Sequence, residues 1–110
     1  MKYLALFVLL IASAHTAGSE ADYVNAHCQG VIEYRLPDRT RVDCLMLDHA
    51  IEYDYGKKWA EAIGQALHYA IMTGKRGGIV LIGDDKRYTN RATNIIQVYS
   101  LPIDLWIISE

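Results

Sequence analysis

The sequence contains few cysteines and no cysteine-based metal motif. Only Cys28 and Cys44 occur among the 110 residues, and neither belongs to a CxxC pair or to a Cys/His spacing. A structural zinc site takes about four such ligands, so this class of site is excluded. In an oxidising compartment two cysteines of this kind are able to form a disulfide. The sequence alone leaves that pairing open.

The sequence also lacks an excess of positive charge and several common catalytic motifs. It has no GxSxG elbow and no GxxxxGK[ST] phosphate loop, and its four histidines show no ligand spacing. The net charge is −2 for the whole chain and becomes −3 once Lys2 is removed with the N-terminal segment. Bulk charge therefore does not attract nucleic acid. Nucleic-acid binding would need a local basic surface, for which the second half offers Lys57, Lys58, Lys75, Arg76, Lys86, Arg87 and Arg91.

Long apolar runs are confined to the first residues of the chain. Residues 3–12 are almost continuously apolar after a basic start at Lys2, and Ala12-Ser13-Ala14 fits a small-x-small cleavage pattern, with a cut near Gly18 as the alternative. The run is shorter than the roughly 20 residues that span a bilayer. Residues 1–18 are therefore predicted to be a signal peptide. The remaining residues 19–110 would form one periplasmic or secreted domain, with no membrane association after cleavage.

Hydrophobic periodicity predicts an α/β domain in residues 19–110. Helices are expected at residues 20–27, 57–73 and 89–99, the first with Ser19 as N-cap and the last ended before Pro102. Strands are expected at residues 31–36, 41–47, 50–55, 79–82 and 103–108, with turns at 77–78 and a polar loop at 84–87. Trp59 and Trp106 are expected in the core. The order α-β-β-β-α-β-α-β predicts a mixed sheet with helices on both faces.

Three carboxylates are predicted to share one surface of this sheet. Asp43 lies in the second strand, and Glu52 and Asp54 lie two residues apart in the third, so the latter two point to the same face. Such a group repels itself unless a divalent cation lies between its members, and oxygen ligands suit Mg²⁺ or Mn²⁺. Glu33 is excluded if the hairpin turn has two residues, although a bulge would reverse that. The alternative is a solvated strand face paired with Lys57 and Arg41.

The next helix supplies further polar residues at helical spacing. Lys58 lies at its start, and Gln65 and Tyr69 follow on one predicted face. A lysine beside a metal–carboxylate site orients water or offsets phosphate charge. Gln65 and Tyr69 provide a hydrogen-bonding pair for a nucleic-acid backbone.

Together these motifs resemble the PD-(D/E)xK nuclease superfamily, which has a restriction-endonuclease-like core. The resemblance rests on Asp43, the Glu52-Tyr53-Asp54 run, Lys58, and the QxxxY pattern of Gln65 and Tyr69 that is typical of the RecB-like branch. It spans residues 20 to about 82, and the predicted element order is that of the superfamily. The resemblance implies that Asp43, Glu52 and Asp54 bind Mg²⁺ or Mn²⁺, with Glu20 assisting from the first helix.

One departure from the superfamily pattern concerns the catalytic lysine. Aspartate stands at position 54, where the ExK motif has lysine, and Lys58 on the neighbouring helix is the candidate replacement. The resemblance implies hydrolysis of DNA, or alternatively RNA, with Asp43, Glu52, Asp54 and Lys58 as catalytic residues. Gln65, Tyr69 and Glu20 would then contact the substrate. Two other interpretations stay open: a nuclease-fold binding module without activity, and a purely structural exported domain. The small size leaves a homodimer open.

Overall fold

The computed structural model describes residues 18–110, and the predicted signal peptide lies outside this range except for Gly18. The elements run in the predicted order α-β-β-β-α-β-α-β around one five-stranded sheet. The helices are α2 (Glu20–His27), α3 (Trp59–Thr73) and α4 (Lys86–Val98), with a short 3₁₀ turn η1 (Gly56–Lys58). The strands are β1 (Val31–Arg35), β2 (Arg41–Leu45), β3 (His49–Tyr55), β4 (Arg76–Ile82) and β5 (Ile103–Ile108).

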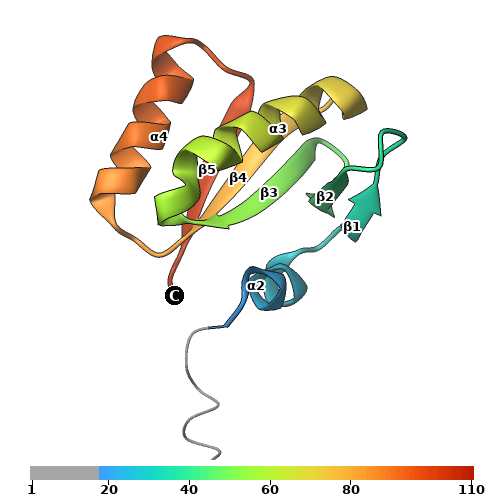
Figure 1. Cartoon of the computed structure of the whole chain (residues 1–110), viewed down its shortest axis with the longest axis horizontal. Coiled ribbons are helices and arrows are strands. Elements are labelled where there is room, and N and C mark those ends of the chain that lie inside the picture. Colours follow the sequence, from blue (N-terminus) through green and yellow to red (C-terminus); the bar gives the residue numbers. More distant parts are fainter. Residues whose placement is uncertain (1–17) are drawn as a thin grey trace, which may run out of the picture.

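The sheet is mixed, and helices cover both of its faces. Strands β1, β2 and β3 form an antiparallel meander, after which β3, β4 and β5 are parallel and connected through α3 and α4. Figure 1 shows α3 crossing the sheet with α4 beside it, whereas α2 lies apart from them. The predicted α/β class and the helices on both faces are thus confirmed. Within residues 18–110, no helix has the length and hydrophobicity needed to cross a membrane.

Two apolar layers enclose the sheet. On the side of α3 and α4, Ala62, Ala66 and Ala92 pack on Ile79 and Leu81 of β4. These small helix residues bring the helices close to the strands. The opposite layer is smaller, with Val24 as the only buried residue of α2.

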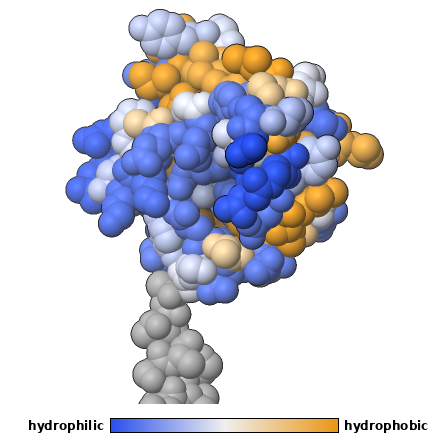
Figure 2. Space-filling view, turned by 45° about the vertical axis from the view of Figure 1, so that its right-hand side comes forward, coloured by the Kyte–Doolittle hydropathy of each residue, from blue (hydrophilic) through white to orange (hydrophobic). Residues whose placement is uncertain are grey.

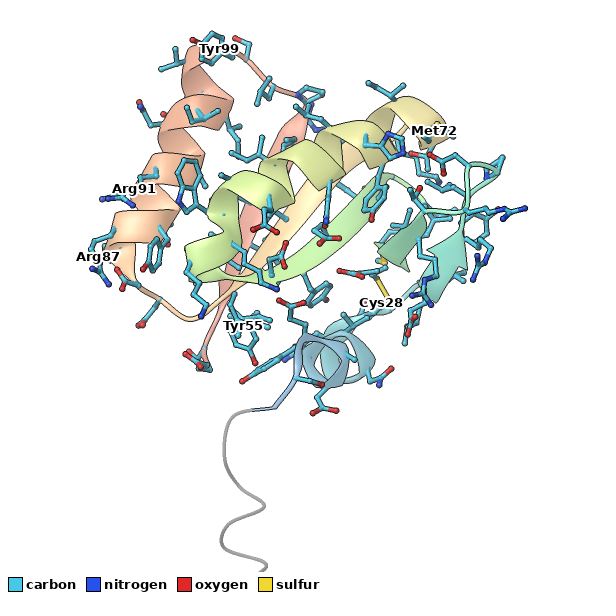
Figure 3. The ribbon with its side chains drawn as sticks, in the orientation of Figure 1. Cys28, Tyr55, Met72, Arg87, Arg91 and Tyr99 are labelled. Carbon is cyan, nitrogen blue, oxygen red and sulfur yellow. A yellow bond between two sulfur atoms is a disulfide. The ribbon has the colours of Figure 1, made fainter. Side chains whose placement is uncertain are left out.

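A disulfide joins Cys28 at the end of α2 to Cys44 in β2 (Figure 3). The sequence left this pairing open. Because α2 buries only one side chain, the disulfide is a main covalent anchor of that helix. Its presence is consistent with an oxidising, extracytoplasmic compartment.

The predicted turn at Gly77-Gly78 was wrong, because both glycines lie inside β4. A Cβ on Gly77 would lie 2.8 Å from the backbone oxygen of Ala66 in α3, and one on Gly78 would lie 3.0 Å from the ring of Trp106. Gly77 therefore lets α3 approach β4 closely, and Gly78 does the same for the Trp106 ring. Both glycines are needed for packing between distant parts of the chain and not for a turn. Both tryptophans were expected in the core. Trp106 is 43% exposed, so this prediction was wrong for Trp106, whereas Trp59 is partly buried against the core.

Other boundaries differ through local hydrogen bonding. Helix α4 begins at Lys86, inside the expected loop, because the Asp85 side chain accepts a hydrogen bond from the backbone N–H of Arg87 and caps the helix. Helix α3 begins at Trp59 after the η1 turn, so Lys58 is its N-cap residue and not part of it. Strands β1 and β2 are one and two residues shorter than expected, and β3 and β4 begin earlier.

A charged cluster joins the amino-terminal ends of β3, β4 and β5. His49 Nε2 lies 2.6 Å from Asp104 Oδ2, and His49 Nδ1 lies 2.9 Å from Asp48 Oδ1. Arg76 donates to the same Asp104 carboxylate, and the Trp106 ring meets the His49 ring edge to face at 5.2 Å. The sequence did not predict this cluster, because its residues are far apart along the chain and the histidines show no ligand spacing.

The stability of the fold is expected to decrease as the pH rises through the titration of His49. Burial alone would lower the pKa of His49, but hydrogen bonds to Asp104 and Asp48 more than offset it, so the pKa is raised. A pKa that is higher in the folded state stabilises the fold below the ordinary value of 6.5, and this contribution is lost above the folded-state value. Between pH 5.5 and 9, the melting temperature of the wild type should therefore fall more steeply with rising pH than that of His49→Gln. The exposed His27→Gln is the control, and identical profiles for wild type and His49→Gln would contradict the prediction.

Candidate functional site

Strands β2 and β3 bring the carboxyl groups of Asp43 and Glu52 into contact where the pairing of the two strands ends. The paired residues Cys44–Ile51 and Leu45–Ala50 set a register in which the next opposing pair is Asp43 and Glu52. Beyond this point the ladder opens, and the backbone N–H of Tyr53 donates to Asp43 Oδ2 at 2.8 Å. The Asp43 carboxylate therefore takes the place of the backbone carbonyl that would otherwise accept from Tyr53, and this hydrogen bond fixes its position.

Glu52 and Asp54 lie under α3, and both are buried. Their side chains alternate with Ile51 and Tyr53, which pack on the opposite layer, so Glu52 and Asp54 face α3. The exposed fractions are 6% for Glu52 and 4% for Asp54. The solvated, lysine-paired strand face considered as an alternative is thus wrong.

Burial and mutual repulsion shift the titration of this group. Desolvation, and then the charges of Asp43 and Asp54, raise the pKa of Glu52 to about 11. Desolvation is also the main cause that raises the pKa values of Asp54 and Asp43. Without a cation, Glu52 is protonated at neutral pH and hydrogen-bonds with its neighbouring carboxylates. Asp54 Oδ2 is fully buried and has no hydrogen-bond partner within the described residues.

Glu20 and Lys58 extend the carboxylates into a continuous row. Lys58 Nζ lies 3.3 Å from Glu20 Oε2, and the Glu20 carboxyl also contacts Asp54. The hydrogen bond and the charge of Glu20, followed by the charge of Asp54, raise the pKa of Lys58, so it is an ammonium group at neutral pH. Asp43, Glu52, Asp54, Glu20 and Lys58, in this order, are called the carboxylate row below.

Helix α3 brings Gln65 and Tyr69 against the same row. With its amide nitrogen turned towards Glu52, Gln65 donates to both carboxylate oxygens, with a separation of 3.1 Å to Oε1. Tyr69 is buried, and desolvation together with the charges of Glu52, Asp43 and Asp54 raises its pKa to about 12. Its hydroxyl therefore keeps its proton and is able to donate a hydrogen bond.

The structure thus brings together all seven residues predicted for the site. Figure 3 shows several oxygen-tipped side chains in the region between β3, α3 and α2. Lys58 lies in the η1 turn as the N-cap residue of α3, so it reaches the row from the start of the helix that carries Gln65 and Tyr69.

Glu33 also lies beside the site, contrary to the prediction. The hairpin connection spans five residues between the paired Arg35 and Arg41, and this register sets Glu33 opposite Asp43. Glu33 and Asp43 line a cavity of about 190 Å³ between α2 and β1. Arg41 contacts Glu33 at 2.9 Å, so this carboxylate is paired. The length of the connection decides whether Glu33 and Asp43 lie on the same face of the sheet. It could not be predicted from the residues Pro37 to Thr40.

The donor set suits a hard divalent cation. Asp43, Glu52 and Asp54 offer only oxygen atoms, which Mg²⁺ and Mn²⁺ prefer. The orphaned Asp54 Oδ2 and the raised pKa of Glu52 are both features that such a cation would relieve. Within residues 18–110, no group of three His, Cys, Asp or Glu side chains is arranged so that it could hold a metal ion. The carboxyl groups are instead hydrogen-bonded to one another, with Glu52 between the two aspartates.

Comparison with known proteins adds no assignment: no protein family, curated protein or solved structure matches this chain. The site is therefore interpreted from its own chemistry.

Proposed function

We propose that this protein is a metal-dependent phosphodiesterase that cleaves nucleic acid, DNA more readily than RNA. The observation that carries the proposal is the buried carboxylate row, with an unpartnered Asp54 oxygen at its centre and the Lys58 ammonium at its end. Burying several carboxylates is costly unless a cation or protons offset their charge. A cation bound at the row would offset the negative charge of the carboxylates. Its remaining positive charge would then attract a phosphate.

The resemblance to PD-(D/E)xK nucleases supports the same conclusion. The element order is the one that the resemblance implies, and Gln65 and Tyr69 contact or adjoin Glu52 as substrate-positioning residues would. These residues come from separate motifs in the sequence, and their convergence on one site would not be expected of unrelated surface residues.

Each residue of the row then has a defined role. Asp43 and Glu52 would hold Mg²⁺ or Mn²⁺, and Asp54 would assist. Such an ion supplies Lewis acidity and lowers the pKa of a bound water. The Lys58 ammonium orients the attacking water and offsets charge on the phosphate, because it carries no free lone pair to act as a base. The Gln65 amide and the Tyr69 hydroxyl hold the phosphate backbone by hydrogen bonds.

The rival function is a nuclease-fold binding module without activity. The observation that favours it is the ion pair between Lys58 and Glu20, which already occupies the ammonium group of the proposed replacement lysine. An active enzyme needs this lysine to face the substrate phosphate.

A homodimer also remains a proposal for this chain. Strand β1 forms an edge of the sheet, and its Val31, Ile32 and Tyr34 side chains are exposed. Unpaired edge strands with apolar side chains are common sites of strand pairing between chains.

Activity is expected to depend on a divalent metal and on Lys58. Residues 19–110 should cleave plasmid and linear DNA with Mg²⁺ or Mn²⁺ and not with EDTA. The Lys58→Met variant should lose about 10²–10³-fold in kcat, as when one preorganised charge donor is removed. Lys86→Met, an exposed lysine on α4, is the control and should cleave normally.

The lysine assignment has a rescue test. Adding Asp54→Lys to the Lys58→Met variant rebuilds the ExK pattern on β3 and should recover part of the lost activity. If Lys58→Met cleaves as fast as wild type, the hypothesis that Lys58 replaces the lysine of the ExK motif is wrong. If wild type binds DNA without cleaving it under any metal condition, the binding module replaces the enzyme.

A further inference from the structure

A second cavity lies at the carboxyl-terminal ends of the three parallel strands. It has a volume of about 730 Å³, which is within the range of small-molecule sites. In open α/β sheets, ligands commonly bind at this end of the strands. The lining residues come from the ends of β3, β4 and β5, the η1 turn and the start of α4, and they include Tyr55, Lys57, Asp84, Arg87, Tyr88 and Glu110.

This strand-end cavity adjoins the carboxylate row through consecutive residues. On β3, Asp54 belongs to the row, and the next residue, Tyr55, lines the cavity. In η1, Lys58 belongs to the row and the preceding Lys57 lines the cavity. The two sites are therefore adjacent along the chain, at the carboxyl-terminal end of β3 and in the η1 turn that follows it. Figure 3 shows Tyr55 and Arg87 at the same end of the molecule, remote from Met72 and Tyr99.

The lining favours a flat, uncharged group over a phosphate. Tyr55 and Tyr88 contribute aromatic rings, and the Tyr88 ring packs against Gly56, where a Cβ would lie 3.1 Å from it. The cations do not outweigh the acids: Arg87 is already paired with Asp85 at 2.7 Å, whereas Asp84 and Glu110 add negative charge. An anion would be repelled here, but the N–H donors of a nucleobase would find carboxylate acceptors and aromatic surfaces.

We infer that the strand-end cavity binds the nucleobase of the nucleotide next to the scissile phosphate, an inference that rests on the proposed function. The phosphodiester would lie at the carboxylate row. The adjacent base would stack on Tyr88 in the cavity by displacing the Arg87 guanidinium, which lies over the ring at 5.1 Å from its centroid. A base can enter such a cavity only when it is unpaired, so the enzyme would prefer single-stranded or frayed nucleic acid. Base stacking on an aromatic residue accounts for roughly tenfold or more in affinity per base.

The test compares Tyr88→Leu with Tyr99→Leu on a single-stranded oligodeoxynucleotide. Leucine keeps most of the side-chain volume but removes the stacking surface. Tyr99 is a matched control, since it is 70% exposed just after the other end of α4. Tyr88→Leu should raise KM about tenfold with little change in kcat, while Tyr99→Leu leaves both unchanged. An unchanged KM for Tyr88→Leu, in an enzyme that cleaves DNA, would overturn the subsite and leave the proposed function intact.

A second measurement distinguishes a failure of the proposed nuclease function from a failure of the base subsite. If wild type cleaves nothing, the proposed function fails, and the subsite is tested by binding of a dinucleotide in EDTA, followed by NMR. Binding that is weakened by Tyr88→Leu and not by Tyr99→Leu supports the base subsite without catalysis. Absent binding, or binding that is equal in all three proteins, overturns it.

Discussion

The Glu52→Gln variant is expected to lose metal-dependent cleavage while its metal-free form unfolds at the same or a higher temperature than wild type. Glutamine has the shape of the protonated acid that occupies this position without a cation, and it keeps a partner for Gln65. It cannot become an anionic ligand. Loss of one such ligand removes several kcal/mol of charge stabilisation, or about 10³-fold in rate.

The direction of the stability change follows from the raised pKa of Glu52. The folded state holds the proton at Glu52 more tightly than the unfolded chain, in which the ordinary value is 4.5. Above that pH the unfolded chain gains by releasing the proton, so Glu52 lowers stability as the pH rises. Glutamine removes this dependence. Thermal unfolding in EDTA at pH 5 and pH 8 measures it, with the exposed Glu61→Gln on α3 as control. A Glu52→Gln protein that is less stable than wild type at pH 8 and still cleaves would contradict both parts.

Loss of the Cys28–Cys44 disulfide is expected to destabilise the fold and to inactivate the site before global unfolding. The bond closes a loop of sequence separation 16. For a loop of this length the chain-entropy model gives about 3 kcal/mol, which lowers the Tm of a domain of this size by roughly 12–24 °C. The Cys28→Ala/Cys44→Ala variant, compared with wild type by thermal unfolding, measures this term.

The effect on activity comes from the position of the disulfide. Cys44 directly follows Asp43, and Cys28 ends the helix that carries Glu20. Because Val24 is the only buried side chain of α2, reduction would release this helix and, with it, the contact between Glu20 and Lys58. Cleavage at 25 °C should therefore fall when wild type is treated with dithiothreitol, and the double variant should be equally slow with or without it. Full activity of the reduced, folded protein would show that α2 holds its place without the bond.

Local signals in the sequence predicted those elements whose ends depend on their own residues. Ser19 and Asp22 form the capping box that starts α2 at Glu20, and Pro102 precedes the expected strand β5. The period-two spacing of Glu52 and Asp54 was enough to place both on one face. The capping role of Asp85 was also readable in principle, because an aspartate before a helix is a common N-cap.

Features that depend on distant residues could not be predicted. Gly77 and Gly78 look like a turn unless one knows that α3 and Trp106 approach β4. The place of Glu33 beside Asp43 depends on the length of the hairpin connection. The pairing of Lys58 with Glu20 links residues 38 positions apart. Each of these is a tertiary contact with no local signature.

The metal-binding carboxylate row is the central claim, and calorimetric titration of Mn²⁺ into residues 19–110 at pH 7 tests it without assuming a substrate. Because Glu52 is protonated in the metal-free protein and burial raises the pKa of Asp54 to about 7, binding a cation at pH 7 should release at least one proton, seen as heats that differ between buffers of different ionisation enthalpy. The Asp43→Asn and Glu52→Gln variants should not bind. Absence of Mn²⁺ and Mg²⁺ binding by the folded, disulfide-bonded wild type, or equal binding by both variants, would contradict the account.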